Sequence, residues 1–185
     1  MAGGEFFFVD AFNIYLAVLT AFVSMTTAIF SRRYMRRERE HGRVGHVGMR
    51  FYHAMFQLFI FAMLLCLLTN NVGILWIAME LATLSTVLLV SLYRTPTAIE
   101  AAWKYFILGS VGISLAFFGT ILVYLVAQDV IGEGLAAMSW DRLVEGAPQF
   151  EPRLLSLAFV FLLVGYGTKI GLAPFHAWLP DAHAE

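Results

Sequence analysis

The chain has 185 residues, of which 60% are hydrophobic and only 14% are charged, where soluble domains carry about a quarter. A soluble core of this size could not bury so much apolar surface, so the composition excludes an ordinary soluble domain and predicts an all-α integral membrane protein. The net charge of −1 gives no indication of a nucleic-acid partner, and we expect none. Cys66 is the only cysteine, which excludes a disulfide within the chain and a cysteine-based metal site.

Five apolar stretches are long enough to cross a bilayer as helices, which takes about 20 residues each. Met1–Glu5 precedes them and is acidic rather than basic, which argues against a cleavable signal peptide. We expect a single transmembrane region over 1–185, with no soluble domain and with the last span continuing as a broken extension over 173–185. In chain order the predicted spans are 6–30, 51–68, 72–93, 103–127 and 154–172.

The connections between these spans differ in charge. The loop predicted over 31–50 carries seven arginines and should be cytoplasmic, because an excess of Lys and Arg marks cytoplasmic loops. The loop over 128–153 carries five acids against two arginines and should lie outside. Counting spans then places the N-terminus outside and the C-terminus in the cytoplasm, in the inner (cytoplasmic) membrane of a bacterium or archaeon. The arginines could alternatively dock anionic lipid or an acidic partner, although a topology signal alone accounts for them.

Two ionisable residues fall inside the predicted spans, where a charge is costly and each is therefore a functional candidate. Glu80 lies about a third of the way into the third span, too deep to reach either surface. Lys169 lies near the inner end of the fifth span, within Gly165–Pro174, whose three glycines and proline predict a break in the helix. A lysine at a helix break is typical of ion-handling sites in transporters. Alternatively, Glu80 could be a static partner between helices, and Lys169 could extend to the cytoplasmic interface.

The fourth predicted span begins near a lysine and carries a row of small residues. Lys104 follows Glu100 by four residues, a spacing that favours an ion pair on the surface of a helix. Gly112, Ala116 and Thr120 recur at every fourth position, which allows another helix to approach closely. We interpret this row as a packing surface and expect it to need helices from partner subunits.

Two histidines near the C-terminus are candidates for proton relay. His176 and His183 are seven residues apart and would share one face of a helix, close to Asp181. The spacing does not match a zinc site, so we predict no metal here. Because histidine titrates near neutral pH, the pair is better suited to passing protons.

The sequence GTKIGLAPFHAWLPDAHAE, from Gly167 to Glu185, resembles the signature of a family of antiporter-like membrane subunits. These subunits occur in respiratory complex I, Mrp sodium/proton antiporters and group 4 membrane-bound nickel–iron hydrogenases. The run 76–80 resembles the family's glutamate-bearing helix, and EAAWKY at 100–105 resembles its next, lysine-bearing helix. The resemblance covers essentially the whole chain and is strongest to the N-terminal half of the large membrane subunit of the hydrogenase-4 and formate hydrogenlyase type.

The resemblance implies a site and a function. It implies that Glu80, Lys104 and Lys169 belong to a proton path. Because a nearby carboxylate favours the charged form of a lysine, Glu80 and Lys169 would form a switched pair in this path. The implied function is proton translocation by a membrane subunit of a redox-driven complex of the hydrogenase or complex I type. Two alternatives stay open: an Mrp-type antiporter or inorganic-carbon uptake subunit, and a structural accessory subunit without transport.

The same reasoning bears on cofactors and partners. The sequence carries no flavin, iron–sulfur or nickel motif, so we expect no cofactor in this chain and no redox catalysis of its own. Redox subunits elsewhere in a complex, other membrane subunits and the lipid bilayer are the expected partners. The family's usual first two helices are missing, and its eighth helix would follow the last residue. We therefore expect part of an antiporter-like half-module: a fragment, a split-gene product or a reduced paralogue.

Overall fold

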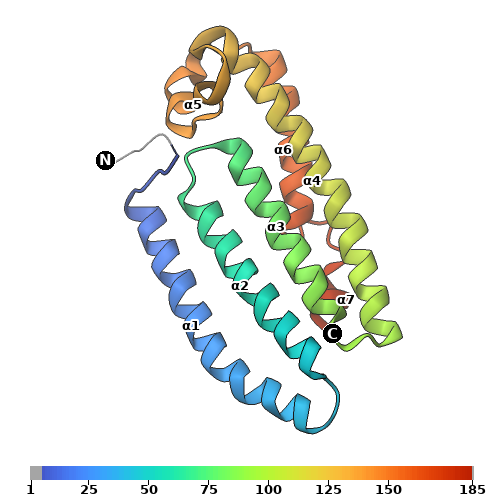
Figure 1. Ribbon diagram of the computed structural model, residues 1–185. Helices are drawn as coiled ribbons and strands as arrows, with labels where there is room; N and C mark the ends of the chain where they lie inside the picture. Colours follow the sequence, from blue (N-terminus) through green and yellow to red (C-terminus); the bar gives the residue numbers. More distant parts are fainter. Residues whose placement is uncertain (1–5, 185) are drawn as a thin grey trace.

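The computed structural model describes residues 6–184, most of which are helical (Figure 1). Met1–Glu5, on which the signal-peptide argument rests, and Glu185 lie outside the described residues. The long helices are α1 (Ala11–Glu40), α2 (His46–Leu68), α3 (Val72–Val90), α4 (Pro96–Ile131) and α6 (Pro152–Lys169). The short elements are η1 (Ser91–Tyr93), η2 (Gly134–Met138), α5 (Trp140–Gly146), η3 (Ala147–Gln149) and α7 (Leu179–Ala184).

Four helices of the described chain are long and apolar enough to cross a membrane: α1, α2, α3 together with η1, and α4. The protein is thus a multi-pass helical membrane protein. The fifth predicted span corresponds to α6, which is not one of the four. This helix has 18 residues, which gives about 27 Å of length, and it carries Arg153 and Lys169 near its ends. Length and apolarity support four spans, and the count of five stays a prediction.

The long helices lie side by side, and helices that follow one another in the chain pack against each other (Figure 1). Thus α1 packs on α2, α2 on α3, α3 on α4, and α4 on α6. The most buried of the four candidate spans is α4, whereas most of α1 faces outward. Residues 6–10, the α2–α3 turn and the α4–α6 connection gather at one end. The α1–α2 and α3–α4 turns lie at the other end, toward which α7 also lies.

Local sequence accounts for where the helices begin. The side-chain oxygen of Asn71 accepts hydrogen bonds from the N–H groups of Gly73 (2.9 Å) and Ile74 (3.1 Å), so α3 starts directly after it. The connection between α2 and α3 is thus a tight turn over 69–71. Thr95 and Glu151 cap α4 and α6 in the same way, and each is followed by a proline in the first turn, where no backbone N–H is needed.

The arginine-rich segment is mostly helix rather than loop. The α1 helix continues to Glu40 and α2 begins at His46, so the connection covers only 41–45, and the prediction of a loop over 31–50 is wrong. Arginine is a good helix former, so a change from apolar to charged residues does not end a helix. Gly42, with φ of 71°, lies just beyond the end of α1. Similarly, α4 extends beyond the predicted 103–127 at both ends.

Small residues bring α4 and α6 into close contact. A Cβ atom placed on Gly112 would lie 2.7 Å from Cβ of Thr168, and one placed on Gly165 would lie 2.7 Å from Cβ of Ala116. The predicted row of small residues is thus a packing surface, which also includes the buried Thr120. Its partner is a helix of the same chain. The expectation that this row needs helices from other subunits is therefore wrong, because α6 already covers it.

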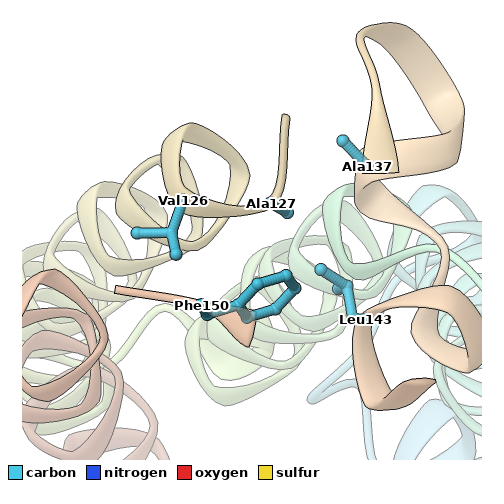
Figure 2. Packing of buried hydrophobic residues seen from close by; sticks show 5 residues of the cluster. All are labelled: Val126, Ala127, Ala137, Leu143 and Phe150. Atoms are coloured by element: carbon cyan, nitrogen blue, oxygen red, sulfur yellow. The ribbon is translucent and has the colours of Figure 1, made fainter. Parts of the chain in front are cut away.

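The connection between α4 and α6 folds over one end of the helices. Ala137, Leu143 and Phe150 of this connection pack on Val126 and Ala127 of α4, and all five side chains are buried (Figure 2). The predicted acidic loop is therefore a small ordered cap that includes α5, with these three apolar side chains packed on α4.

Asn70 attaches this cap to the α2–α3 turn. Its side chain is 1% exposed and donates to Oδ1 of Asp141 (3.2 Å) and Oγ of Ser139 (3.3 Å), while its Oδ1 accepts from the Asp141 N–H (3.3 Å). Its backbone C=O accepts from the N–H of Trp140 at 2.7 Å. The N–H of Asn70 in turn donates to the C=O of Phe6 at 2.9 Å. One buried asparagine thus connects three segments at this end.

Candidate functional site

The site forms around Lys169, the last residue of α6. The helix ends here because Gly171 adopts φ of 74°, and the chain then runs through an irregular segment to α7. This confirms the predicted break of the last helix. The Lys169 side chain is partly buried and points to α3 and α4, where its Nζ donates to Oγ1 of Thr83 and to the hydroxyl of Tyr105 (3.1 Å). Both acceptors are neutral hydroxyl groups.

Tyr105 is held from several sides. It is 6% exposed, and its hydroxyl shares a 2.9 Å hydrogen bond with Oγ1 of Thr86. Its ring stacks on that of Trp178 with centroids 4.4 Å apart, and Nζ of Lys169 lies 5.2 Å from its centroid. The indole N–H of Trp178 donates to the C=O of Thr168 at 2.9 Å. The segment after the helix break thus folds back and packs against the site.

Glu80 lies on α3, three residues before Thr83 and therefore on the same side of the helix. Its Oε2 is buried and has no hydrogen-bond partner among the described residues. Across residues 6–184, no ion pair joins Glu80 to Lys169. The two predicted residues are brought to the same region, but the lysine binds the hydroxyls one helical turn away from the carboxylate.

Lys104 lies on the outside of α4, next in sequence to the buried Tyr105. Its Nζ is 2.8 Å from Oε1 of Glu100, as the spacing predicts, and 2.8 Å from Oδ2 of Asp181 near the start of α7. All three side chains are well exposed to the surroundings. The geometry makes Lys104 a link between α4 and α7, and its place in a proton path stays a prediction.

The two histidines lie in different kinds of structure. His176 is in the irregular segment after Gly171, and His183 is in α7, so they do not share a helix face and that expectation is wrong. The physical reason is the break itself, because no continuous helix runs from 170 to 184. Both side chains are exposed, and no group of three or more potential metal ligands gathers in the described part of the chain. The relay role of the histidines stays a prediction.

Four residues of the site were not predicted from the sequence: Thr83, Thr86, Tyr105 and Trp178. A weak signal exists, since Glu80, Thr83 and Thr86 recur at every third position of an apolar helix. Isolated hydroxyls in such helices usually bond to the backbone of their own helix, so this spacing alone does not indicate a site.

A family described as NADH:quinone oxidoreductase/Mrp antiporter, TM, matches residues 69–185. The chain is 54% identical over 182 residues to the hydrogenase-4 component F homolog of Methylacidiphilum infernorum (isolate V4), covering 98% of this chain and 38% of that protein. It is 25% identical over 178 residues to NADH-quinone oxidoreductase subunit N of Coxiella burnetii (strain RSA 493 / Nine Mile phase I), covering 96% of this chain and 34% of the relative. The chain thus spans little more than a third of the length of these curated relatives.

Two solved structures are similar in fold. One is the membrane-bound sulfane sulfur reductase, an archaeal respiratory membrane complex, with a TM-score of 0.63 and 25% identity over 70% of this chain and 25% of that one. The other is respiratory complex I from Thermus thermophilus with bound aureothin, with a TM-score of 0.59 and 31% identity over 71% of this chain and 27% of that one. In both, the similar region is about a quarter of a longer chain.

Proposed function

Because the chain belongs to the NADH:quinone oxidoreductase/Mrp antiporter transmembrane family, we propose that it is a proton-translocating membrane subunit, or part of one, of a redox-driven complex of the hydrogenase or complex I type. The observation that carries this proposal is the position of Lys169. Its ammonium group lies between helices and contacts Thr83. One turn before Thr83 on α3 lies Glu80, whose buried Oε2 has no hydrogen-bond partner within residues 6–184. Charged groups placed in this way inside a membrane are costly and are kept for ion movement.

The proton step follows from the chemistry of lysine. Removal from water disfavours the ammonium form, and a nearby carboxylate favours it again. A movement or neutralisation of Glu80 therefore decides whether Lys169 keeps its proton or passes it to a water or side chain within reach. In this proposal, redox events in partner subunits drive that change, and this chain supplies only the proton carrier.

The remaining predicted residues fit an entrance to this path. Lys104, His176 and His183 are exposed near α7, and we assign them to the side from which protons reach Lys169. A Lys104→Arg variant tests this role, since arginine can keep both ion pairs but cannot release a proton. Normal translocation by the variant would make Lys104 a structural link only.

The proposal includes an arrangement in the membrane. We take α6 as a fifth crossing, short and broken at Lys169, with the arginine-rich end cytoplasmic. The N-terminus then lies outside and the C-terminus in the cytoplasm of a bacterial or archaeal cell. Partners are other membrane subunits and redox subunits of one complex, by analogy with the relatives, whose names describe components of such assemblies.

The test is redox-driven acidification in vesicles that contain the assembled complex. In Lys169→Arg the charge stays but the proton cannot be released, so translocation should be lost while the complex still assembles. Lys169→Met should also fail. Wild-type translocation by Lys169→Arg would mean that the lysine is a structural charge and would refute the proposal.

The family description also names Mrp antiporters, so sodium/proton exchange is a second candidate. Vesicles with an imposed sodium gradient and no redox substrate separate the two. Proton movement in response to sodium alone would favour the antiporter, whereas movement only during turnover of a redox partner favours the first proposal.

A further inference from the structure

We propose that Thr83 and Tyr105 are positioning residues that form a second binding place for the Lys169 amine, so that the lysine alternates between these two hydroxyls and the Glu80 carboxylate. This inference rests on the proposed function. It adds the groups that bind the Lys169 amine when the amine is not bound to Glu80. We call the pair Thr83 and Tyr105 the hydroxyl station.

The hydrogen bonds around the station fix the direction of each donor. The hydroxyl of Thr83 donates to the C=O of Met79 (2.9 Å), and that of Thr86 donates to the C=O of Ala82 (2.9 Å). The Tyr105 hydroxyl can then donate to Oγ1 of Thr86. The oxygens of Thr83 and Tyr105 are thereby free to accept from Lys169, as the geometry requires.

This arrangement suits both protonation states of the lysine. An ammonium group has three donors and a neutral amine has two, and the station uses two. Loss of a proton therefore breaks neither hydrogen bond. A carboxylate, in contrast, binds strongly only the charged form. Movement between the two places thus changes how firmly the lysine holds its proton.

Both partners at the station are rigid. Thr83 is 1% exposed, and the ring of Tyr105 is fixed by its stacking on Trp178. Trp178 is itself tied to the C=O of Thr168, the residue before Lys169. The moving part is therefore the flexible four-carbon stem of the lysine rather than the station.

The carboxylate lies within reach of the same stem. Glu80 and Thr83 are one turn apart on α3, a rise of about 4.5 Å along the helix axis. The buried Oε2 of Glu80 is without a hydrogen-bond partner in the described chain, and such a group gains most from an arriving donor. The structure thus corresponds to the lysine at the hydroxyl station with the acid place open.

The experiment measures the reactivity of the Lys169 amine directly, in the assembled complex in membranes. A membrane-permeant acylating reagent modifies neutral amines, and mass spectrometry gives the extent at each site. The sequence contains only two lysines, so the exposed Lys104 is an internal standard. The variants are Tyr105→Phe, which keeps the ring on Trp178, and Thr83→Val, which keeps the shape of the side chain.

If the lysine alternates between two binding places, the station variants should change the labelling rate of Lys169 in opposite directions with and without Glu80. With Glu80 present, loss of a station hydroxyl moves the lysine to the carboxylate, and labelling should slow about tenfold, the scale of one hydrogen bond to a charged group. In a Glu80→Gln background no acid is available, so the same variants should label about tenfold faster. Disruption of packing alone would accelerate labelling in both backgrounds, and that result would overturn the proposal.

Two control variants and a parallel measurement of proton translocation accompany the labelling experiment. Thr83→Ser restores the hydroxyl and should label like the wild type, and failure to do so would contradict the station. Tyr124→Phe removes a hydroxyl elsewhere on α4, one that accepts from the N–H of Gly134 (3.4 Å), and should change nothing. Redox-driven acidification is measured on the same membranes. If the station variants change labelling in opposite directions in the two backgrounds but the wild type does not translocate protons, the hydroxyl station is supported and the proposed function is refuted.

Discussion

Asp141 is the residue whose charge holds the cap over α4 to the α2–α3 turn. Burial acts to raise the pKa of its carboxyl, but hydrogen bonds from the Arg142 N–H, Asn70 and Ser139 outweigh this and lower the pKa below its usual value. The charged form is therefore the one that stabilises the cap. Because this carboxyl lies in the connection between α4 and α6, pH in the surrounding water acts on it directly.

We predict that the cap loosens in acid. A lowered pKa contributes stability that is fully present above the ordinary value near 3.8 and is lost as the pH falls through the lower, folded value. The protection factor of the Trp140 N–H, which donates to Asn70, compares its exchange with that of an unstructured amide at the same pH. It should therefore fall below about pH 4, the usual range of aspartate. In Asp141→Asn the protection factor should be lower at neutral pH and change little with acid. An unchanged pH profile in that variant would assign the effect to another group.

At the site, Glu80 and Lys169 should not act independently. Lys169→Met removes the carrier, so adding Glu80→Gln should reduce redox-driven acidification no further. Glu80→Gln alone should slow proton uptake, because the lysine loses the acid that favours its charged form. Additive losses in the double variant would mean that the two residues serve separate steps.

The two charged residues of this site can be predicted from the sequence, but the hydroxyl groups that bind the lysine cannot. Glu80 and Lys169 could be predicted because charges are rare within apolar helices. Thr83 and Tyr105 could not, since a threonine in a helix commonly satisfies its hydroxyl on the carbonyl four residues before, as Thr83 does with Met79. Only the arrival of Lys169 from α6, 86 residues away in sequence, gives that oxygen a second role.

Among the helices, the contact between α4 and α6 should be the most sensitive to a single methyl group. In Gly165→Ala the new Cβ would lie 2.7 Å from Cβ of Ala116 and from the C=O oxygen of Gly112, both on a rigid helix. We expect a loss of about 1–3 kcal/mol, the usual cost of overpacking, and a lower midpoint of thermal unfolding in mild detergent.

Gly167→Ala is the matched control on the same helix. Its Cβ would meet the flexible side chain of Leu172 at 3.3 Å, which can move aside. Alanine favours a helix more than glycine does, so Gly167→Ala should be neutral or stabilising. A similar loss in both variants would mean that the close approach of α4 does not set the cost.

At this scale, apolar length predicts that a helix exists but not where it ends. The break after Lys169 could be predicted because Gly171 and Pro174 act locally. The continuation of α1 to Glu40 could not, because arginines end an apolar stretch without ending a helix. The helix that packs on the small-residue row could not be predicted either, since the sequence pattern shows that a helix can approach closely but not which helix does so.

For the whole molecule, the proposed orientation can be tested with single cysteines in a Cys66→Ala background. Ser139, in the loop predicted to be outside, is 8% exposed and unsuitable, whereas Leu135 is 65% exposed and Val47 is 81% exposed. Leu135→Cys should react with an impermeant maleimide from outside, and Val47→Cys only after permeabilisation. The opposite pattern would invert the proposed orientation.

The same approach tests whether α6 crosses the membrane. If it does, His183→Cys in α7 lies in the cytoplasm and should react like Val47→Cys. If His183→Cys instead reacts from outside, as Leu135→Cys does, then α6 enters the membrane and returns to the same side. The chain would then have four crossings.

The consecutive packing of the helices has a consequence for biogenesis. Each long helix after α1 contacts the one made just before it, so the chain can assemble pair by pair as it leaves the ribosome and enters the membrane. Some contacts must wait for later segments, and Asn70 is an example, because its hydrogen bonds reach residues 69 and 71 positions later. Until α4 and the cap have been synthesised, this buried amide has only water or lipid headgroups beside it. Closure of the cap over Asn70 thus has to wait for the synthesis of α4 and the cap, and until then an insertion chaperone would need to protect this amide.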